Sequence, residues 1–208
     1  MVDAAMANIA DLRARIAKCR KCIEAPIRGP LPHQPRPVVI LSRSAKVRII
    51  GQAPGTRVHA SGKPFTDPSG DRLREWMGID EETFYDADKL AITPMGFCFP
   101  GLDAKGGDLP PRKECAASWQ EEVTNAMPQV KLVLLIGLYA QKHYLGKAAS
   151  RTLTETVSNW QAILESSSDP AFLPLPHPSW RNNAWIKKNP FFSNALIPEL
   201  RKLIQLYM

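Results

Sequence analysis

No apolar run in this 208-residue sequence approaches the ~20 residues that a helix needs to cross a bilayer, so we expect no membrane segment. The first 22 residues carry charges throughout and lack the uninterrupted apolar stretch of a secretory signal peptide, so we expect a cytoplasmic protein. Internal repeats and low-complexity segments are also absent, which argues against repeat architectures. A composition with 44% hydrophobic and 23% charged residues is typical of a globular protein, and we expect one domain over residues 1–208.

Cysteine is scarce, because the chain has only four: Cys19, Cys22, Cys98 and Cys115. In a reducing cytoplasm such a set is typical of metal ligands or buried thiols and not of disulfides. The spacing is one C-x-x-C pair followed by two distant single cysteines. A four-cysteine zinc site usually shows two close pairs, whereas iron–sulfur clusters accept looser spacing. The spacing by itself leaves a metal site and a set of buried thiols as alternatives.

Acidic residues are outnumbered, since 27 Lys and Arg against 20 Asp and Glu give a formal net charge of +7. A positive excess favours a polyanionic partner, because binding releases the counterions that surround a polyanion. Many basic proteins bind no nucleic acid, so the charge does not identify that partner.

Four short segments rich in β-branched and aliphatic residues are predicted strands. They cover residues 46–50, 90–93, 130–137 and 171–176. Helices are predicted over residues 7–19, 68–78, 112–127, 138–146, 152–165 and 190–206. Asp67 followed by Pro68 predicts the N-terminal cap of one of them. The alternation of strands and helices predicts an α/β fold with three layers, α/β/α, around a central four-stranded parallel sheet.

In such a sheet, ligands bind outside the carboxyl ends of the strands, and several chemically active residues are expected at that rim. Residues 51–55 form a strand-ending turn with two glycines and a proline, which lets a backbone approach a ligand closely. The turn is not a nucleoside-triphosphate phosphate loop, because no Gly-Lys-Ser/Thr follows it. His177 opens a second turn after the last predicted strand. Either turn alone is often structural, but two of them at one rim favour a functional site.

Four features, in order along the chain, carry a resemblance to a known family. They are Gly-Gln-Ala-Pro-Gly at 51–55, Gly-Lys-Pro-Phe at 62–65, His-Pro-Ser at 177–179 and the four cysteines. Over residues 17–204 this combination resembles the uracil-DNA glycosylase superfamily, most closely its iron–sulfur branch, often called family four. The resemblance implies a DNA repair enzyme that hydrolyses the N-glycosidic bond of uracil in DNA and leaves an abasic site. It also implies a 4Fe-4S cluster whose ligands are Cys19, Cys22, Cys98 and Cys115.

The resemblance also implies roles for residues of the two turns. His177 is expected to donate a hydrogen bond to uracil O2 as the base leaves, and Phe65 to stack on the extruded base. The first motif departs from the pattern, because family four has glutamate where this chain has Gln52, and the founding branch has aspartate where it has Ala53. A glutamine positions water through its amide oxygen but is not a base at neutral pH. We therefore expect Gln52 and backbone carbonyls of the turn to hold the attacking water, beside Ala53 in the base pocket, with His59 a less favoured candidate.

The group that reads the uracil edge is open. Relatives often carry an asparagine at the end of the second strand, where this chain has Pro94. Asn182 and Asn183 are candidates to supply an amide to the base pocket, and their alternative role is to cap a turn or helix. Backbone groups of residues 94–97 are a third option.

The segment after His-Pro-Ser enters the minor groove in this superfamily, so Ser179, Trp180 and Arg181 are expected to contact DNA. Other candidates for phosphate contacts are the cations that flank the two turns, although each alone is more often a solvated charge. These are Arg57, Lys63, Lys187 and Lys188.

We expect a monomer whose partner is uracil-containing or abasic DNA, single- or double-stranded. One alternative is a DNA-binding protein of glycosylase fold that holds uracil or abasic DNA with weak turnover, because Gln52 and Ala53 replace acidic groups. The other is a hydrolase of free nucleosides, which the net charge of +7 and the position of Trp180 disfavour.

Overall fold

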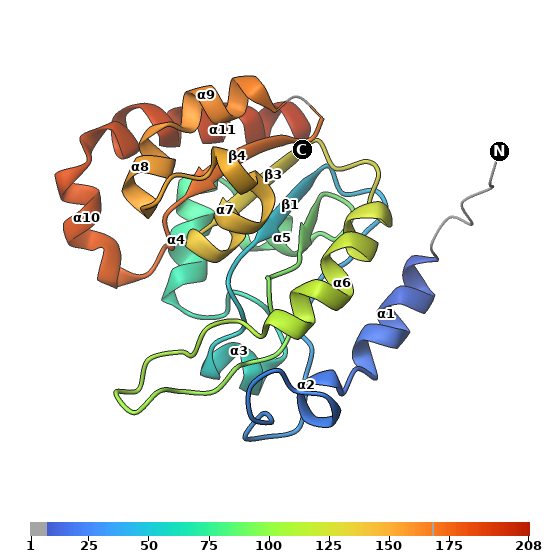
Figure 1. The fold of residues 1–208 in the computed structure, drawn as a ribbon. Helices are drawn as coiled ribbons and strands as arrows, with labels where there is room; N and C mark the ends of the chain where they lie inside the picture. Colours follow the sequence, from blue (N-terminus) through green and yellow to red (C-terminus); the bar gives the residue numbers. More distant parts are fainter. Residues whose placement is uncertain (1–7, 168) are drawn as a thin grey trace.

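A computed structural model describes residues 8–167 and 169–208, and its centre is one sheet of four parallel strands in the order β2-β1-β3-β4 (Figure 1). The strands are β1 Val47–Ile50, β2 Leu90–Ile92, β3 Leu132–Ile136 and β4 Ala171–Leu175. Apart from the partly exposed Phe172, every strand residue is buried, as expected of a parallel sheet covered on both faces. The predicted parallel sheet is confirmed, although each strand is shorter than predicted.

Helices cover both faces of this sheet. Ile49 packs in an apolar cluster with residues of α4, α5, α9 and α11, and its neighbour Ile50 packs in a second cluster with α1, α6 and α7, because successive strand residues point to opposite faces. The helices are α1 Ile9–Ala17, α2 Lys21–Glu24, α3 Thr56–Ser61, α4 Pro68–Met77, α5 Glu81–Tyr85, α6 Lys113–Asn125, α7 Leu138–Leu145, α8 Leu153–Ser158, α9 Trp160–Ser166, α10 Asn183–Lys188 and α11 Ile197–Tyr207. The three-layer arrangement is as predicted. No helix in the described ranges is both long and apolar enough to cross a membrane.

The helix predictions differ from the structure mainly where helices are short. The helices α2, α3, α5 and α10 have six residues or fewer and were not predicted, because so few residues show no clear apolar period. The predicted helix over 152–165 is two helices, α8 and α9, which meet at Asn159. The predicted helix over 190–206 contains a π-helical turn, Phe192–Leu196, before α11. Residue 7 of the first predicted helix lies outside the described residues.

The predicted cap of α4 is present, and it lies beside the site described below. The side chain of Asp67 accepts hydrogen bonds from the backbone N–H groups of Ser69 at 3.0 Å and Gly70 at 3.3 Å. Pro68 occupies the first helical position, where its missing N–H leaves no hydrogen bond unmade.

Backbone hydrogen bonds continue the sheet pattern beyond the ends of the strands. The N–H groups of Met95 and Gly96 donate to the carbonyl oxygens of Gly51 and Gln52, both at 2.9 Å. The segments that follow β1 and β2 are therefore fixed against each other. His177 follows β4 two strands away, so the predicted turns meet at one rim of the sheet.

A buried arginine on β1 supports the segment that follows β2 through hydrogen bonds. Arg48, on β1, is only 2% exposed and donates to the hydroxyl of Thr93 at 2.6 Å and to Oε1 of Gln120 at 2.9 Å. Nε2 of Gln120 then donates to the carbonyl oxygen of Pro94 at 2.7 Å. Burial lowers the pKa of Arg48, and the hydroxyl of Tyr144 opposes that shift. The chain of hydrogen bonds fixes Pro94 at the rim.

Candidate active site at the carboxyl rim

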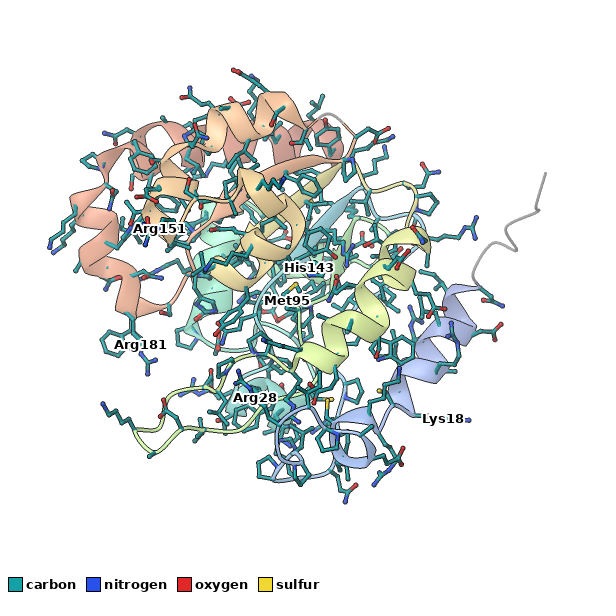
Figure 2. The ribbon with its side chains drawn as sticks, viewed as in Figure 1. Lys18, Arg28, Met95, His143, Arg151 and Arg181 are labelled. Atoms are coloured by element: carbon teal, nitrogen blue, oxygen red, sulfur yellow. The ribbon has the colours of Figure 1, made fainter. Side chains whose placement is uncertain are left out.

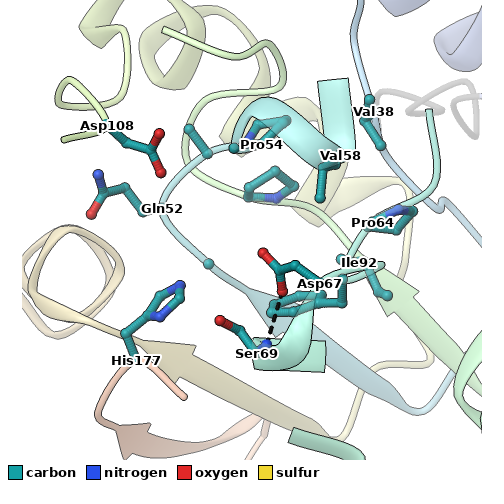
Figure 3. A pocket seen from close by; sticks show the side chains of 15 residues that line it. Val38, Gln52, Pro54, Val58, Pro64, Asp67, Ser69, Ile92, Asp108 and His177 are labelled. Carbon is teal, nitrogen blue, oxygen red and sulfur yellow. Dashed lines mark hydrogen bonds between the residues drawn. The ribbon is translucent and has the colours of Figure 1, made fainter. Parts of the chain in front are cut away.

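A pocket lies at this rim, between the turn after β1 and the turn after β4 (Figure 3). Gln52 and His177, which we predicted to converge on one slot, both line it, as do Ala53 and Phe65. The remaining lining residues are Val38, Gly51, Pro54, Gly55, Val58, Pro64, Asp67, Ser69, Ile92, Pro94 and Asp108.

The His177 side chain points into the pocket in Figure 3, and its hydrogen bonds define which ring nitrogen carries the proton. The backbone N–H of Ser179 donates to Nδ1 of His177 at 3.2 Å, so in the neutral ring the proton sits on Nε2. Burial lowers the pKa of His177, an effect that the carboxylates of Asp67 and Asp108 oppose. The neutral ring therefore presents an N–H donor to the pocket at physiological pH.

The two asparagines that we considered for base recognition hold the His-Pro-Ser turn instead. Nδ2 of Asn182 donates to the carbonyl oxygen of His177 at 2.6 Å. Oδ1 of Asn183 accepts from Arg72 at 2.7 Å, and the same guanidinium nitrogen of Arg72 donates to the carbonyl oxygen of Ser179 at 3.1 Å. Neither asparagine is among the described residues that line the pocket. Nδ2 of Asn182 and Oδ1 of Asn183 are thus engaged at the His-Pro-Ser turn.

Phe65 forms one wall of the pocket in a backbone conformation that phenylalanine rarely adopts. Its φ of 55° lies in the left-handed region, which costs a bulky residue energy unless its surroundings impose it. The hydroxyl of Tyr85 donates to the carbonyl oxygens of Pro64 at 2.7 Å and Phe65 at 3.2 Å. Gly70 permits the approach of α4, because a Cβ there would lie 1.9 Å from the Phe65 carbonyl oxygen. Strain held in place by neighbours is typical of a functional position.

Two carboxylates in the pocket were not predicted as site residues. Asp67 was expected only as a helix cap, and Asp108 lies on the loop between β2 and α6, for which no role was predicted. Burial raises the pKa of Asp108, while the charges of Arg181 and His177 lower it. Asp67 and Asp108 are 41 positions apart, so no short motif in the sequence joins these two carboxylates.

His59, our less favoured candidate for the water site, belongs to a different cluster. Its ring packs against His33 with 4.3 Å between centroids and against Phe99 with 5.7 Å. Burial lowers its pKa, and the charges of His33 and Arg36 add to that effect. It is not among the described residues of the pocket lining.

The residues expected to contact DNA lie in different settings. Trp180 is 72% exposed, and Arg181 extends outward from the same turn (Figure 2). Arg57 on α3 is exposed as well. Lys63 differs, because its ammonium pairs with Glu81 at 2.9 Å and lies 3.7 Å from the centroid of the Tyr85 ring. Lys187 and Lys188 are exposed at the end of α10.

All four cysteines are free thiols and line one small cavity beside Trp119. The backbone N–H of Phe97 donates to Sγ of Cys115 at 3.2 Å. Burial raises the pKa of the Cys98 thiol to about 12 and also raises the pKa of Cys22 and Cys115. In the described ranges, no three His, Cys, Asp or Glu side chains converge closely enough to hold a single metal ion. A 4Fe-4S cluster makes a different demand, because its thiolates surround four irons, and four cysteines around one cavity fit that demand.

A three-layer fold whose rim pocket joins a donating histidine to an aromatic wall and two carboxylates is suited to a DNA repair glycosylase, an enzyme that removes a base drawn into such a pocket. A family model described as the uracil DNA glycosylase superfamily matches residues 39–201, which is more than half of the chain. The chain therefore belongs to the uracil DNA glycosylase superfamily, as its motifs predicted. The matched span begins after Cys19 and Cys22, so membership of the iron–sulfur branch stays a prediction.

Proposed function

We propose that this protein hydrolyses the N-glycosidic bond between uracil and deoxyribose in DNA. The observation that carries the proposal is the hydrogen bond from the Ser179 N–H to Nδ1 of His177, which leaves the Nε2–H of the neutral ring to act in the pocket. Family membership implies a DNA substrate, and the side chains of the pocket support uracil as the base that is removed.

An active site cannot reach a base inside a duplex, so the base must first rotate out, at a cost of a few kcal/mol. We propose that the extruded uracil stacks on Phe65. As the glycosidic bond breaks, negative charge grows on uracil O2, and Nε2–H of His177 stabilises it. A preorganised donor of this kind contributes about 2.7–4 kcal/mol to transition-state stabilisation.

The uracil edge needs a partner with both a donor and an acceptor, and the structure narrows the candidates. The backbone N–H groups of Met95, Gly96 and Phe97 already donate to other atoms, and Pro94 has none. Among the described residues that line the pocket, Gln52 alone carries a side-chain amide. We therefore assign recognition of the base edge to Gln52.

The alternative of a DNA-binding protein with weak turnover depended on the missing acidic groups at Gln52 and Ala53. Asp67 and Asp108 bring carboxylates to the same pocket from other parts of the chain. The pocket thus has the acidic groups that its first motif lacks, which supports hydrolysis.

We also propose that Cys19, Cys22, Cys98 and Cys115 hold a 4Fe-4S cluster. When bound, such a cluster links its ligands covalently, which here ties the α1–α2 segment to the segments that begin at Phe97 and at α6. Because Met95 and Gly96 pair with the turn after β1, that link would steady the rim of the sheet. A brown preparation that loses its visible absorbance in the Cys98→Ala variant supports the cluster, whereas a colourless protein with stoichiometric zinc contradicts it.

The function is tested with a duplex oligonucleotide that contains one uracil, followed by alkali to cut abasic sites. We expect strand scission by the wild type and a loss of about 10²–10³-fold in kcat for His177→Ala. His143→Ala is the matched control, because His143 is on α7 and does not line the pocket. A shifted gel band without scission would establish binding only, and release of uracil from free deoxyuridine would favour a nucleoside hydrolase.

A further inference from the structure

We propose that Asp108 is the catalytic base that binds and deprotonates the attacking water, a role that rests on the proposed hydrolysis of the glycosidic bond. Neither Gln52 nor Ala53 is able to accept a proton at neutral pH, so the first motif leaves this step without a residue. Asp108 fills that gap from the loop between β2 and α6.

The loop presents Asp108 in a defined position. Oδ1 of Asp103 accepts hydrogen bonds from the backbone N–H groups of Lys105 at 2.8 Å and Gly107 at 2.9 Å. On either side of Asp108, the N–H of Asp103 donates to the carbonyl oxygen of Gly107 at 2.8 Å, and the N–H of Leu109 donates to that of Gly101 at 2.9 Å. The loop therefore closes on itself and holds Asp108 at its inner end, although its tip extends from the body of the protein (Figure 1).

The carboxylate of Asp108 faces the turn that follows β1. A Cβ added to Gly55 would lie 3.4 Å from Oδ2 of Asp108, so the absence of a side chain there leaves room for the carboxylate. Figure 3 shows Asp108 and Gln52 along one edge of the pocket, with the His177 ring pointing in from below them. A water held by Asp108 would thus lie near a base that His177 and Gln52 contact.

Asp67 is the other carboxylate of the pocket, and its hydrogen bonds separate its role from that of Asp108. Oδ1 of Asp67 accepts from two backbone N–H groups at the start of α4. In the described part of the chain, no donor hydrogen-bonds to the carboxylate of Asp108, so its lone pairs are free for water. Asp67 is a cap that contributes charge, and Asp108 is the available base.

The charges around Asp108 suit this role. Burial raises its pKa, and the negative charge of Asp67 adds to that effect, while the charges of Arg181 and His177 lower it. A base whose pKa lies above the ordinary aspartate value accepts a proton more readily.

The step balances in atoms and charge. The bond between C1′ and N1 breaks, and its electron pair leaves with the uracil, whose O2 accepts the hydrogen bond from His177. The water oxygen forms the new bond to C1′ and gives one proton to the carboxylate of Asp108, which later releases it to solvent. The uracil anion then takes a proton from solvent.

The test compares Asp108→Asn with Asp67→Asn under single-turnover conditions on uracil-containing duplex, with thermal unfolding as a check on folding. We expect Asp108→Asn to lose about 10²–10⁴-fold in rate at unchanged DNA affinity, and Asp108→Glu to recover part of it. Asp67→Asn keeps the side-chain oxygen that caps α4, so it should change both stability and rate only slightly.

The pH profile provides a readout that a structural role would not change. Wild-type activity requires both an ionised Asp108 and a neutral His177. At pH values below the pKa of both groups, protonation of each lowers the rate, and log rate falls with a slope of two protons. In Asp108→Asn only the His177 proton remains, and the slope of log rate against pH should halve. A folded Asp108→Asn variant within a few-fold of the wild-type rate, or one that keeps the two-proton slope, refutes the role of Asp108. A wild type that releases no uracil refutes the proposed function itself, which is a distinct outcome.

Discussion

Replacing Gly70 by alanine tests whether the backbone strain at Phe65 serves the pocket. Gly70 lies in the first turn of α4, where alanine ordinarily stabilises a helix by about 1 kcal/mol relative to glycine. Here the new Cβ would lie 1.9 Å from the carbonyl oxygen of Phe65 and 2.7 Å from its carbonyl carbon. Those atoms belong to the backbone, so rotation of a side chain does not relieve the clash.

Overpacking of this kind costs about 1–3 kcal/mol, which offsets the helix gain and leaves a net loss of up to about 2 kcal/mol in the free energy of unfolding. To fit the Cβ, the Phe65 segment must move away from α4, and the ring moves with it. A displacement of about 1 Å at a positioning group costs on the order of 10²-fold in rate.

Urea unfolding gives the stability change, and single-turnover release of uracil gives the rate. Gly29→Ala is the matched control, because a Cβ at Gly29 would have no atom within 4 Å. A Gly70→Ala protein that is as stable as the wild type and releases uracil at the same rate would refute the argument that α4 holds the Phe65 wall in place.

Three further predictions follow from the contacts of single side chains. Arg48→Met should lower the free energy of unfolding by about 1–3 kcal/mol, because the buried hydroxyl of Thr93 loses its donor; urea denaturation measures the change, and an unchanged midpoint would contradict it. Asn182→Ala should reduce kcat by up to about tenfold at unchanged DNA affinity, because the hydrogen bond that holds the backbone of His177 is lost; a change in affinity alone would count against it. Arg57→Ala should reduce the slope of log affinity for duplex DNA against log salt by about one counterion. Lys63→Ala should leave that slope unchanged, because the ammonium of Lys63 already pairs with the carboxylate of Glu81. Equal effects of the two variants would contradict this assignment.

Local patterns in the sequence were sufficient to predict the sheet and part of the site. The β-branched and aliphatic runs around Ile49 and Leu134 predicted parallel strands, and the topological rule for such sheets brought Gln52 and His177 to one rim. The cap at Asp67 was predicted from its own proline neighbour. These features depend on residues close together in the chain, or on a rule that holds for every parallel sheet.

Features that depend on contacts between distant segments were not predictable in this way. The amides of Asn182 and Asn183 seemed suited to reading a base, but only the folded turn shows that they bind the backbone of His177 and the guanidinium of Arg72. The ion pair of Lys63 with Glu81 likewise depends on how α5 packs beside the Gly-Lys-Pro-Phe segment at 62–65.

The sequence by itself determined the parallel sheet and the family of the protein, because periodicity and short motifs are local and can be recognised without any knowledge of packing. Only the tertiary structure brought Asp108 to the pocket beside the turn at Gly55 and closed α4 against the backbone of Phe65. Such contacts join segments whose spacing in the chain is arbitrary, and the energy that fixes them comes from burial and hydrogen bonding across the whole fold.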